Sequence, residues 1–320
     1  MQYWRLILVF QKEFKMEETM VTSAKVSKPR RTKRVQISSL LASAPMAIVA
    51  IGVFVVCVGY SVVLSFTKSR LFPNFNWVGL DQYERLWGTS RWIVSVENLF
   101  LYGVLFIALC LVSGFFMAVF LDQKVRFESG FRTLFLYPYA MSLVVTGLVW
   151  QWMMEPSLGL QNVVQRMGWE SFEFAPLVDP QYAIYGVLIA AVWQSSGLVM
   201  ALMLAGLRGI DGEIWKAARV DGIPTWKTYL FIVLPMMRPV MITSVVLLAV
   251  GVVRVYDLIV AQTGGGPGMS TEMPAKFVID HITARGNVGL GMAAATMMLL
   301  PVLLVIGPWI YREYVRPTKH

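Results

Sequence analysis

Six long apolar stretches dominate this sequence. They lie at about 40–66, 98–121, 132–154, 182–207, 236–258 and 290–311. An α-helix needs about 20 mostly apolar residues to cross a bilayer. Only 15% of the 320 residues are charged, whereas about a quarter is typical of a soluble domain. The sequence therefore predicts an all-α integral membrane protein with six transmembrane helices, in a domain that covers residues 38–315.

The distribution of Lys and Arg predicts the orientation of these helices. If the N-terminus is inside, 20 of these residues fall in cytoplasmic segments and seven in outer segments, with Arg254 inside a span. Cytoplasmic loops of membrane proteins carry such an excess. We therefore expect both termini to be cytoplasmic and the loops 67–97 and 155–181 to lie outside. The formal net charge of +9 is then a property of cytoplasmic segments and predicts no nucleic-acid partner.

Residues 1–37 form a basic tail that we expect to be cytoplasmic. A run of Lys and Arg at 28–34 directly precedes the first span, which is typical of a positive-inside anchor beside membrane lipid. The apolar stretch 4–10 is too short to span and has no small-residue cleavage site, so no signal peptide is predicted. It either lies on the membrane surface or precedes a start at Met16 or Met20.

The sequence offers little material for chemistry. Cys57 and Cys110 lie inside apolar spans, and the two histidines, His281 and His320, lie in an outer loop and at the C-terminus. No disulfide framework or metal site is predicted, and no Gly-x4-Gly-Lys-Ser/Thr phosphate loop is present. We expect a chain that is not an enzyme by itself, and a membrane enzyme that uses carboxylates is a weak alternative. A secondary transporter or channel that works without ATP is the second alternative, but its inverted repeats or paired broken helices are not recognisable.

The longest charged interruption in the second half is the segment 209–239. A helix is predicted over Glu213–Val220, where small and charged side chains stand side by side: Lys216, Ala217, Ala218, Arg219 and Asp221. Gly222 ends that helix, because glycine takes a positive φ without strain. Pro224 suits the first turn of a second helix, which we expect to end at Pro235. By these physical criteria a simple interfacial connector and a docking site are equally supported.

The spacing of residues in this segment resembles a known motif. Two alanines, a glycine, an isoleucine and a Leu-Pro pair occupy the positions of the EAA loop of permease subunits from binding-protein-dependent ABC importers: Ala217, Ala218, Gly222, Ile232, Leu234 and Pro235. The stretches 78–87, 138–162 and 256–268 resemble the carbohydrate class of these permeases, the maltose-importer type, in the same order. The resemblance covers most of residues 40–312. This sequence differs from the family motif at Lys216, where the family has a glutamate. Whether the ion pair that this glutamate implies with the ATPase subunit forms here therefore stays an open question.

The resemblance implies partners and a location. A second permease subunit, two ATP-binding subunits that hold ATP and Mg, and an extracytoplasmic sugar-binding protein would assemble with this chain in a bacterial inner membrane. The chain itself would hold no cofactor and would form part of the path for a mono- or oligosaccharide, with glucose, mannose or a small glucoside favoured. The implied ATPase-coupling residues are Glu213, Lys216, Ala217, Ala218, Asp221, Gly222, Leu234 and Pro235.

A polar cluster in the fourth apolar stretch is the main candidate for the sugar path. It comprises Trp193, Gln194, Ser195 and Ser196, followed by Gly197. Amides, hydroxyls and aromatic rings are the groups that suit a sugar's hydroxyls and flat C–H faces. The alternative is that Gln and Ser side chains only join helices through hydrogen bonds.

Further candidates for the path lie in the third and fifth spans. Arg254 and Asp257 are spaced i, i+3 and are predicted to pair on one helix face. Ionisable residues within a span are functional candidates, although a structural ion pair is the alternative. Tyr256 either stacks on sugar or belongs to the aromatic belt at the interface. Thr146 and Trp150 are weaker candidates.

A glycine-rich loop lies at 263–268 in a segment predicted to be outside. Its density of glycines permits tight turns and close approach of another backbone. The resemblance implies contact with the binding protein through Gly264, Gly265, Gly266 and Pro267. The alternative is a plain flexible connector.

Overall fold

The regular structure of this protein is helical. The structure is a computed structural model that describes residues 43–46, 48–123 and 125–310. Within those ranges the only β-type pairings are two isolated bridges. The all-α prediction is therefore confirmed for the described part of the chain. The predicted tail 1–37 and the residues beyond 310 lie outside it.

Among the described residues, three helical segments are long and apolar enough to cross a membrane. The chain divides into two compact units, 1–57 and 58–320, and the first candidate span, Ser43–Ser65, contains η1 (Ile48–Val53) and α3 (Phe54–Ser65). The other two are α5 (Ser90–Asp122) and α9 (Ala183–Arg208). Two bent pairs raise the number to as many as five if each pair is one span. The six-span count and the orientation stay predictions.

The first bent pair coincides with the third predicted span, and the second joins the end of the segment 209–239 to the fifth predicted span. The first pair joins α6 (Glu128–Ala140) to α7 (Leu143–Met153) at 99°, and the second joins Thr225–Met236 to α13 (Arg238–Val253) at 72°. The remaining elements are α4 (Asp81–Trp87), α8 (Leu160–Arg166), α10 (Gly212–Val220), α11 (Thr225–Lys227), η2 (Thr228–Val233), α12 (Leu234–Met236), α14 (Asp257–Gln262), α15 (Pro274–Ile279), η3 (Asp280–Ala284) and α16 (Val288–Ile310).

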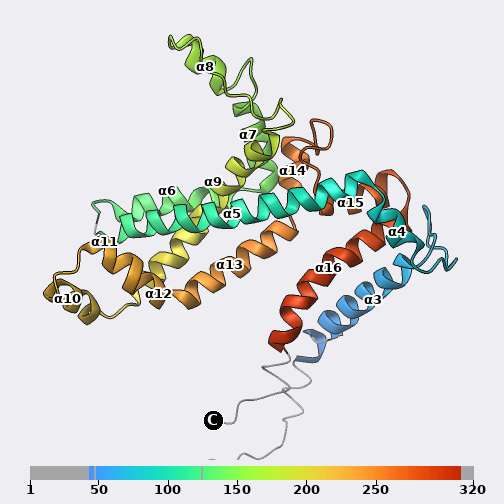
Figure 1. The fold of residues 1–320 in the computed structure, drawn as a ribbon, viewed down its shortest axis with the longest axis horizontal. Helices are drawn as coiled ribbons and strands as arrows, with labels where there is room; N and C mark the ends of the chain where they lie inside the picture. Colours follow the sequence, from blue (N-terminus) through green and yellow to red (C-terminus); the bar gives the residue numbers. More distant parts are fainter. Residues whose placement is uncertain (1–42, 47, 124, 311–320) are drawn as a thin grey trace, which may run out of the picture. The chain divides into compact units, whose positions relative to one another are not determined.

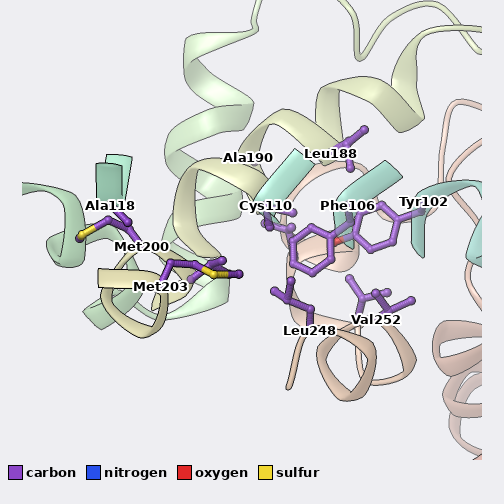
Figure 2. Packing of buried hydrophobic residues seen from close by; sticks show 14 of the residues in the cluster. Tyr102, Phe106, Cys110, Ala118, Leu188, Ala190, Met200, Met203, Leu248 and Val252 are labelled. Atoms are coloured by element: carbon purple, nitrogen blue, oxygen red, sulfur yellow. The ribbon is translucent and has the colours of Figure 1, made fainter. Parts of the chain in front are cut away.

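The main core of the second unit is built on α5. This helix packs along α9 and also contacts α13 (Figure 1). Glycines allow the close approach: a Cβ added at Gly114 would lie 2.6 Å from a Val199 side-chain carbon, and one at Gly103 would lie 3.0 Å from Val252. Figure 2 shows the buried side chains that fill the seam, including the stacked rings of Tyr102 and Phe106, whose centroids are 5.5 Å apart.

A second, smaller core joins α4, the start of α5, α15 and α16. Its buried members are Leu86, Trp92, Phe277, Leu290, Ala293 and Ala294. The loop after α3 is hydrogen-bonded to the loop before α16 and to the first turn of α16. The Leu71 amide donates to the Gly286 carbonyl at 2.8 Å, and the Gly289 amide donates to the Ser69 carbonyl at 2.9 Å.

The third and fifth predicted spans are each interrupted, which corrects the expectation of unbroken helices. The first breaks where Met141 and Ser142 are extended, three residues after Pro138. The second breaks between Val253 and Asp257, and the two helices that follow the breaks, α7 and α14, pack against each other. Met-Ser and Arg-Val-Tyr contain no strong helix breaker, so these breaks depend on tertiary packing that local sequence does not record. The structure therefore contains helix breaks that are not recognisable in the sequence.

Candidate coupling loop and substrate cavity

The segment 209–239 folds into two helices that meet at a bend. The first, α10, begins where the Asp211 carboxylate accepts a hydrogen bond from the Glu213 amide at 3.0 Å, as an N-cap does. The second begins at Thr225 and runs to Met236, one residue beyond the predicted end. Pro224 is its extended N-cap rather than part of its first turn. The predicted helix–bend–helix arrangement is thus present with small shifts in its boundaries.

Gly222 forms the bend through a Schellman motif. Its amide donates to the Arg219 carbonyl at 3.1 Å, and the Ile223 amide donates to the Ala218 carbonyl at 2.9 Å. These two bonds satisfy the last carbonyls of α10 and require a left-handed residue between them. Gly222 has a φ of +66°, which a side chain would strain. The sequence prediction for this glycine is confirmed.

The two faces of α10 differ in exposure. Ala218 is buried and Ala217 is exposed, while the Trp215 ring packs edge-on against the Tyr229 ring of η2 at a centroid distance of 5.0 Å. Lys216 forms an exposed ion pair with Glu213 at 2.8 Å. Such a pair adds little to stability, but it means that the unexpected lysine already has an acidic partner on its own helix.

The other predicted coupling residues lie around the bend. Asp221 is the exposed C-cap of α10. Leu234 is partly buried and Pro235 is exposed, both in the last turn before the 72° bend into α13. The exposed members of the set therefore share one loop, which leaves Ala217, Lys216, Asp221 and Pro235 accessible to a partner.

A cavity of about 620 Å³ opens between α5, α9, α13 and the break after α6. This volume falls in the range of about 300–1,000 Å³ that small-molecule sites occupy. Four of the predicted path residues line it: Gln194, Ser195, Arg254 and Asp257. The helix break at 254–256 and the break at 141–142 both border the cavity.

Gln194 connects the cavity to the broken helix. Its buried side-chain amide donates to the Met141 carbonyl at 2.8 Å, in the extended segment between α6 and α7. One amide N–H and the side-chain carbonyl remain for another partner. Gly197, one turn along α9, lets the α6 backbone approach: a Cβ there would lie 2.0 Å from the Phe135 carbonyl oxygen. Gln194 thus joins helices and also faces the cavity.

The predicted helical pairing of Arg254 and Asp257 is wrong. α13 ends at Val253 and Asp257 begins α14, so the i, i+3 geometry of one continuous helix is absent. The ion pairs of the described residues do not include these two, and both side chains are exposed. They line the cavity as separate charges of opposite sign.

The remaining predicted path residues lie elsewhere. Trp150 and Trp193 contact each other at a centroid distance of 5.8 Å, and Thr146 is buried in α7. Ser196 is buried on another side of α9, and Tyr256 is the residue before α14; none of these five lines the cavity.

Sequence reasoning missed three aromatic residues of the cavity wall. They are Tyr102, Phe106 and Tyr139. Tyr139 lies within the stretch 138–162 that carries the family resemblance, so a signal was present. Tyr102 and Phe106 resemble ordinary residues of an apolar span and give no such signal.

The glycine-rich loop is held by its own hydrogen bonds. The Thr263 and Thr271 hydroxyls lie 2.7 Å apart, and the Thr271 hydroxyl donates to the Gly266 carbonyl at 2.9 Å. Gly264, Gly265 and Gly268 have positive φ. These contacts fix the loop's conformation, which does not favour a plain flexible connector.

A cluster of charged residues beneath this loop was not predicted. Glu272 is 1% exposed, and its carboxylate lies 3.7 Å from the Lys276 ammonium and 3.8 Å from the Arg91 guanidinium. Lys276 also pairs with Asp280. Burial raises the pKa of Glu272, and the two neighbouring cations oppose that rise. The sequence shows these charges, but not that the fold buries them together.

His281 adopts one tautomer in this region. Its Nδ1–H donates to the Phe277 carbonyl at 2.8 Å, because a carbonyl can only accept. Nε2 is then free to accept from the Arg285 guanidinium at 3.3 Å. Burial lowers the pKa of His281, and the nearby guanidinium lowers it further, against the opposing effect of the bond to Phe277. This histidine is therefore a neutral structural residue.

Apolar helices, a small-molecule cavity and an ordered helix–bend–helix loop together define a membrane transport subunit. Residues 111–316 match the family described as "Binding-protein-dependent transport system inner membrane component". The chain belongs to that family, which confirms the resemblance drawn from the EAA loop. Members of this family are permease subunits of ABC transporters and are not enzymes themselves.

Individual relatives agree with this assignment. The chain is 39% identical to a probable ABC transporter permease protein of Pyrococcus horikoshii over 84% of this chain and 93% of that one. It is 33% identical to the xylose/arabinose import permease protein XacH of Haloferax volcanii, over 80% and 81% of the two chains. The fold is similar to that of a bacterial alginate ABC transporter in complex with an alginate pentasaccharide-bound periplasmic protein, with a TM-score of 0.71 at 17% identity, over 87% and 95% of the chains.

Proposed function

We propose that this chain is a permease subunit of an ATP-driven sugar importer and forms part of the sugar path. The proposal rests on two features that this member of the family combines. One is the ordered bend at Gly222. The other is the cavity that is lined by Gln194, Ser195, Arg254 and Asp257. The xylose/arabinose permease relative supports a sugar as the cargo. A secondary transporter or channel is not favoured, because the family works with binding proteins.

The partners follow from the same proposal. A second permease would complete the path, two ATP-binding subunits would hold ATP and Mg on the cytoplasmic side, and an extracytoplasmic binding protein would deliver sugar in a bacterial inner membrane. The arrangement is supported by the family and by the alginate transporter, which was solved with its periplasmic protein. The six spans, the N-in and C-in topology and the domain limits 38–315 belong to this proposal.

Each site has an assigned role in the proposed cycle. The exposed face of the 209–239 loop would seat in a cleft of one ATPase, and ATP-driven closure would shift the permeases between inward- and outward-open states. Such a shift requires that ATP and the binding protein each prefer one state. Gly264 to Pro267 would meet the binding protein, since this loop is already ordered by its own hydrogen bonds.

The cavity has the chemistry of a carbohydrate site. The exposed ring of Tyr139 offers a flat apolar face, the stacked rings of Tyr102 and Phe106 form part of the buried wall, and Gln194 and Ser195 offer amide and hydroxyl groups. Arg254 and Asp257 are separate charges that can each bind a hydroxyl. We propose glucose, mannose or a small glucoside as first candidates, with xylose and arabinose tested beside them.

Three measurements test the proposal. Purification of the tagged chain from its native membrane should bring down an ATPase and a second permease; purification of this chain alone, under conditions that keep other membrane complexes intact, contradicts it. The external binding protein is then titrated with the sugar panel by calorimetry. ATP hydrolysis that rises only when all subunits, the binding protein and its sugar are present establishes the class, whereas sugar uptake without ATP would favour the alternative.

A further inference from the structure

The helix α5 is bonded at both of its ends to segments with proposed roles in transport. In the part of the chain that the structure describes, it is the only helix that, with its C-cap, forms side-chain hydrogen bonds both to the coupling segment 209–239 and to the segment 263–273. α5 contains 33 residues, which corresponds to about 50 Å of helix.

The C-terminal end of α5 is joined to Tyr229. The Gln123 side-chain amide donates to the Tyr229 hydroxyl at 3.0 Å, and that hydroxyl donates to the Asp122 carboxylate at 3.4 Å. The Tyr229 ring is 8% exposed and packs edge-on against Trp215 of α10. A shift of α10 therefore presses on a ring whose hydroxyl is bonded to α5.

The N-terminal end of α5 is joined to the glycine-rich loop. The Asn98 amide donates to the Ser270 carbonyl at 3.1 Å and to the Glu272 carbonyl at 3.0 Å. Arg91 pairs with the Glu272 carboxylate. That carboxylate lies directly beneath the loop, since a Cβ added at Gly265 would be 2.8 Å from it. The loop therefore rests on side chains that α5 holds.

No break separates the two ends. α5 is one continuous α-helix without proline. Its start packs against α4, α15 and α16, and its remaining length packs against α9 and α13 (Figures 1 and 2). Asn98 and Asp122 are about 36 Å apart along the helix axis. A close-packed helix moves as a unit because side chains in contact cannot be compressed independently.

We propose that Tyr229 and Asn98 are positioning residues of the transport cycle, which attach the coupling loop and the binding-protein loop to opposite ends of one rigid helix. The inference rests on the proposed function. Movement of the coupling helices at the ATPase then displaces α5, and α5 displaces the glycine-rich loop. Tyr229 contacts α10 through its ring and is bonded to α5 and its C-cap through its hydroxyl, and Asn98 contributes through its bonds to loop carbonyls.

The test measures whether a nucleotide at the cytoplasmic side changes the outer loop. The complete importer is placed in lipid nanodiscs, and hydrogen exchange of segment 263–273 is compared with and without trapped Mg·ADP–vanadate. We expect a difference in the wild type. We expect Tyr229→Phe or Asn98→Ala to reduce it by at least about fivefold, because about fivefold is the effect of one lost hydrogen bond and each variant removes two or more. The double variant should lose little more than either single variant, because both lie on one route.

Matched controls separate positioning from simple destabilisation. Tyr182→Phe and Asn162→Ala remove the same groups at positions where no side-chain bond is seen, and should keep the wild-type response. A purely structural role would raise exchange equally in both nucleotide states and leave the difference between them unchanged. Three results would overturn the link through α5. They are an equal rise of exchange in both nucleotide states, a full nucleotide response in both single variants, and additive losses in the double variant.

The outcome also distinguishes this inference from the proposed function. An importer that hydrolyses ATP but shows no nucleotide-dependent change in segment 263–273 overturns the link and leaves the proposed function standing. A chain that assembles with no ATPase overturns the proposed function, and the link with it.

Discussion

Replacement of Gly222 gives the sharpest test of the coupling bend. The residue has a φ of +66°, and a Cβ there would meet nothing within 4 Å. The cost of a side chain is therefore conformational and not steric within this chain. Alanine in this left-handed region costs roughly 1–2 kcal/mol, which changes the population of the bent conformation by a factor of roughly 5–30.

A graded series separates conformation from contact. Gly222→Asn should be mild because asparagine tolerates this conformation, and Gly222→Ala should be intermediate. Gly222→Pro should be severe, because proline fixes φ near −65° and lacks the N–H that bonds Arg219. We expect the complex to assemble in each case, while the sugar taken up per ATP hydrolysed falls in the order Asn, Ala, Pro.

The assay uses proteoliposomes loaded with ATP and the sugar that the binding-protein titration identifies. Gly212→Ala is the matched control, since Gly212 lies in α10 with free space around it and an ordinary φ. If the larger asparagine uncouples more than alanine, a steric clash with the partner is responsible instead of φ. Normal uptake per ATP in Gly222→Pro would refute the reasoning.

Three further predictions concern the cavity and the outer region. Gln194→Ala should raise the half-saturating sugar concentration by about fivefold, through loss of one hydrogen bond, in an uptake assay with the complex still assembled. Gly197→Ala should lower the free energy of unfolding by about 1–3 kcal/mol, because the α6 backbone must move to admit the methyl group; thermal unfolding in detergent measures it. The pKa of His281 is lowered in the fold, so the unfolded chain binds more protons and the melting temperature should fall as the pH drops through and below about 6.5; His281→Gln should flatten that dependence.

Controls accompany these predictions. An unchanged half-saturating concentration together with a lower melting temperature would make Gln194 a helix-joining residue only. Gly130→Ala has free space and should leave the melting temperature nearly unchanged. A pH dependence of the melting temperature that is the same in His281→Gln and wild type would assign the effect to another group.

The coupling loop was predictable because its signals are local. A glycine that needs positive φ, small alanines beside charges and a proline at a helix start each act within a few residues, and the structure places them as expected except for small shifts at Pro224 and Met236. The membrane class was equally accessible, because span length and charge content depend only on composition along the chain.

The cavity could not be predicted from the sequence, because its walls are formed by a helix break that depends on tertiary packing. The residues from Arg254 to Tyr256 include no helix breaker, so the sequence predicted a continuous helix in which Arg254 and Asp257 would pair. The helix is broken there, and the two residues line the cavity without pairing. Packing of α7 on α14 accompanies that break. The periodic spacing of apolar residues shows in the sequence which side chains share a helix face. A helix break that is stabilised by packing against another helix leaves no such periodic signal.

The sequence by itself determined that the chain is helical and membrane-embedded, and that a bend at Gly222 separates two short helices. Those properties follow from hydrophobic span length and from backbone preferences of single residues. Only the tertiary structure decided that Glu272 is buried beside Lys276, that Gln194 is bonded to Met141, and that α5 with its C-cap is bonded to the segments 209–239 and 263–273. These are contacts between residues far apart in sequence, and they exist only after the apolar faces have packed.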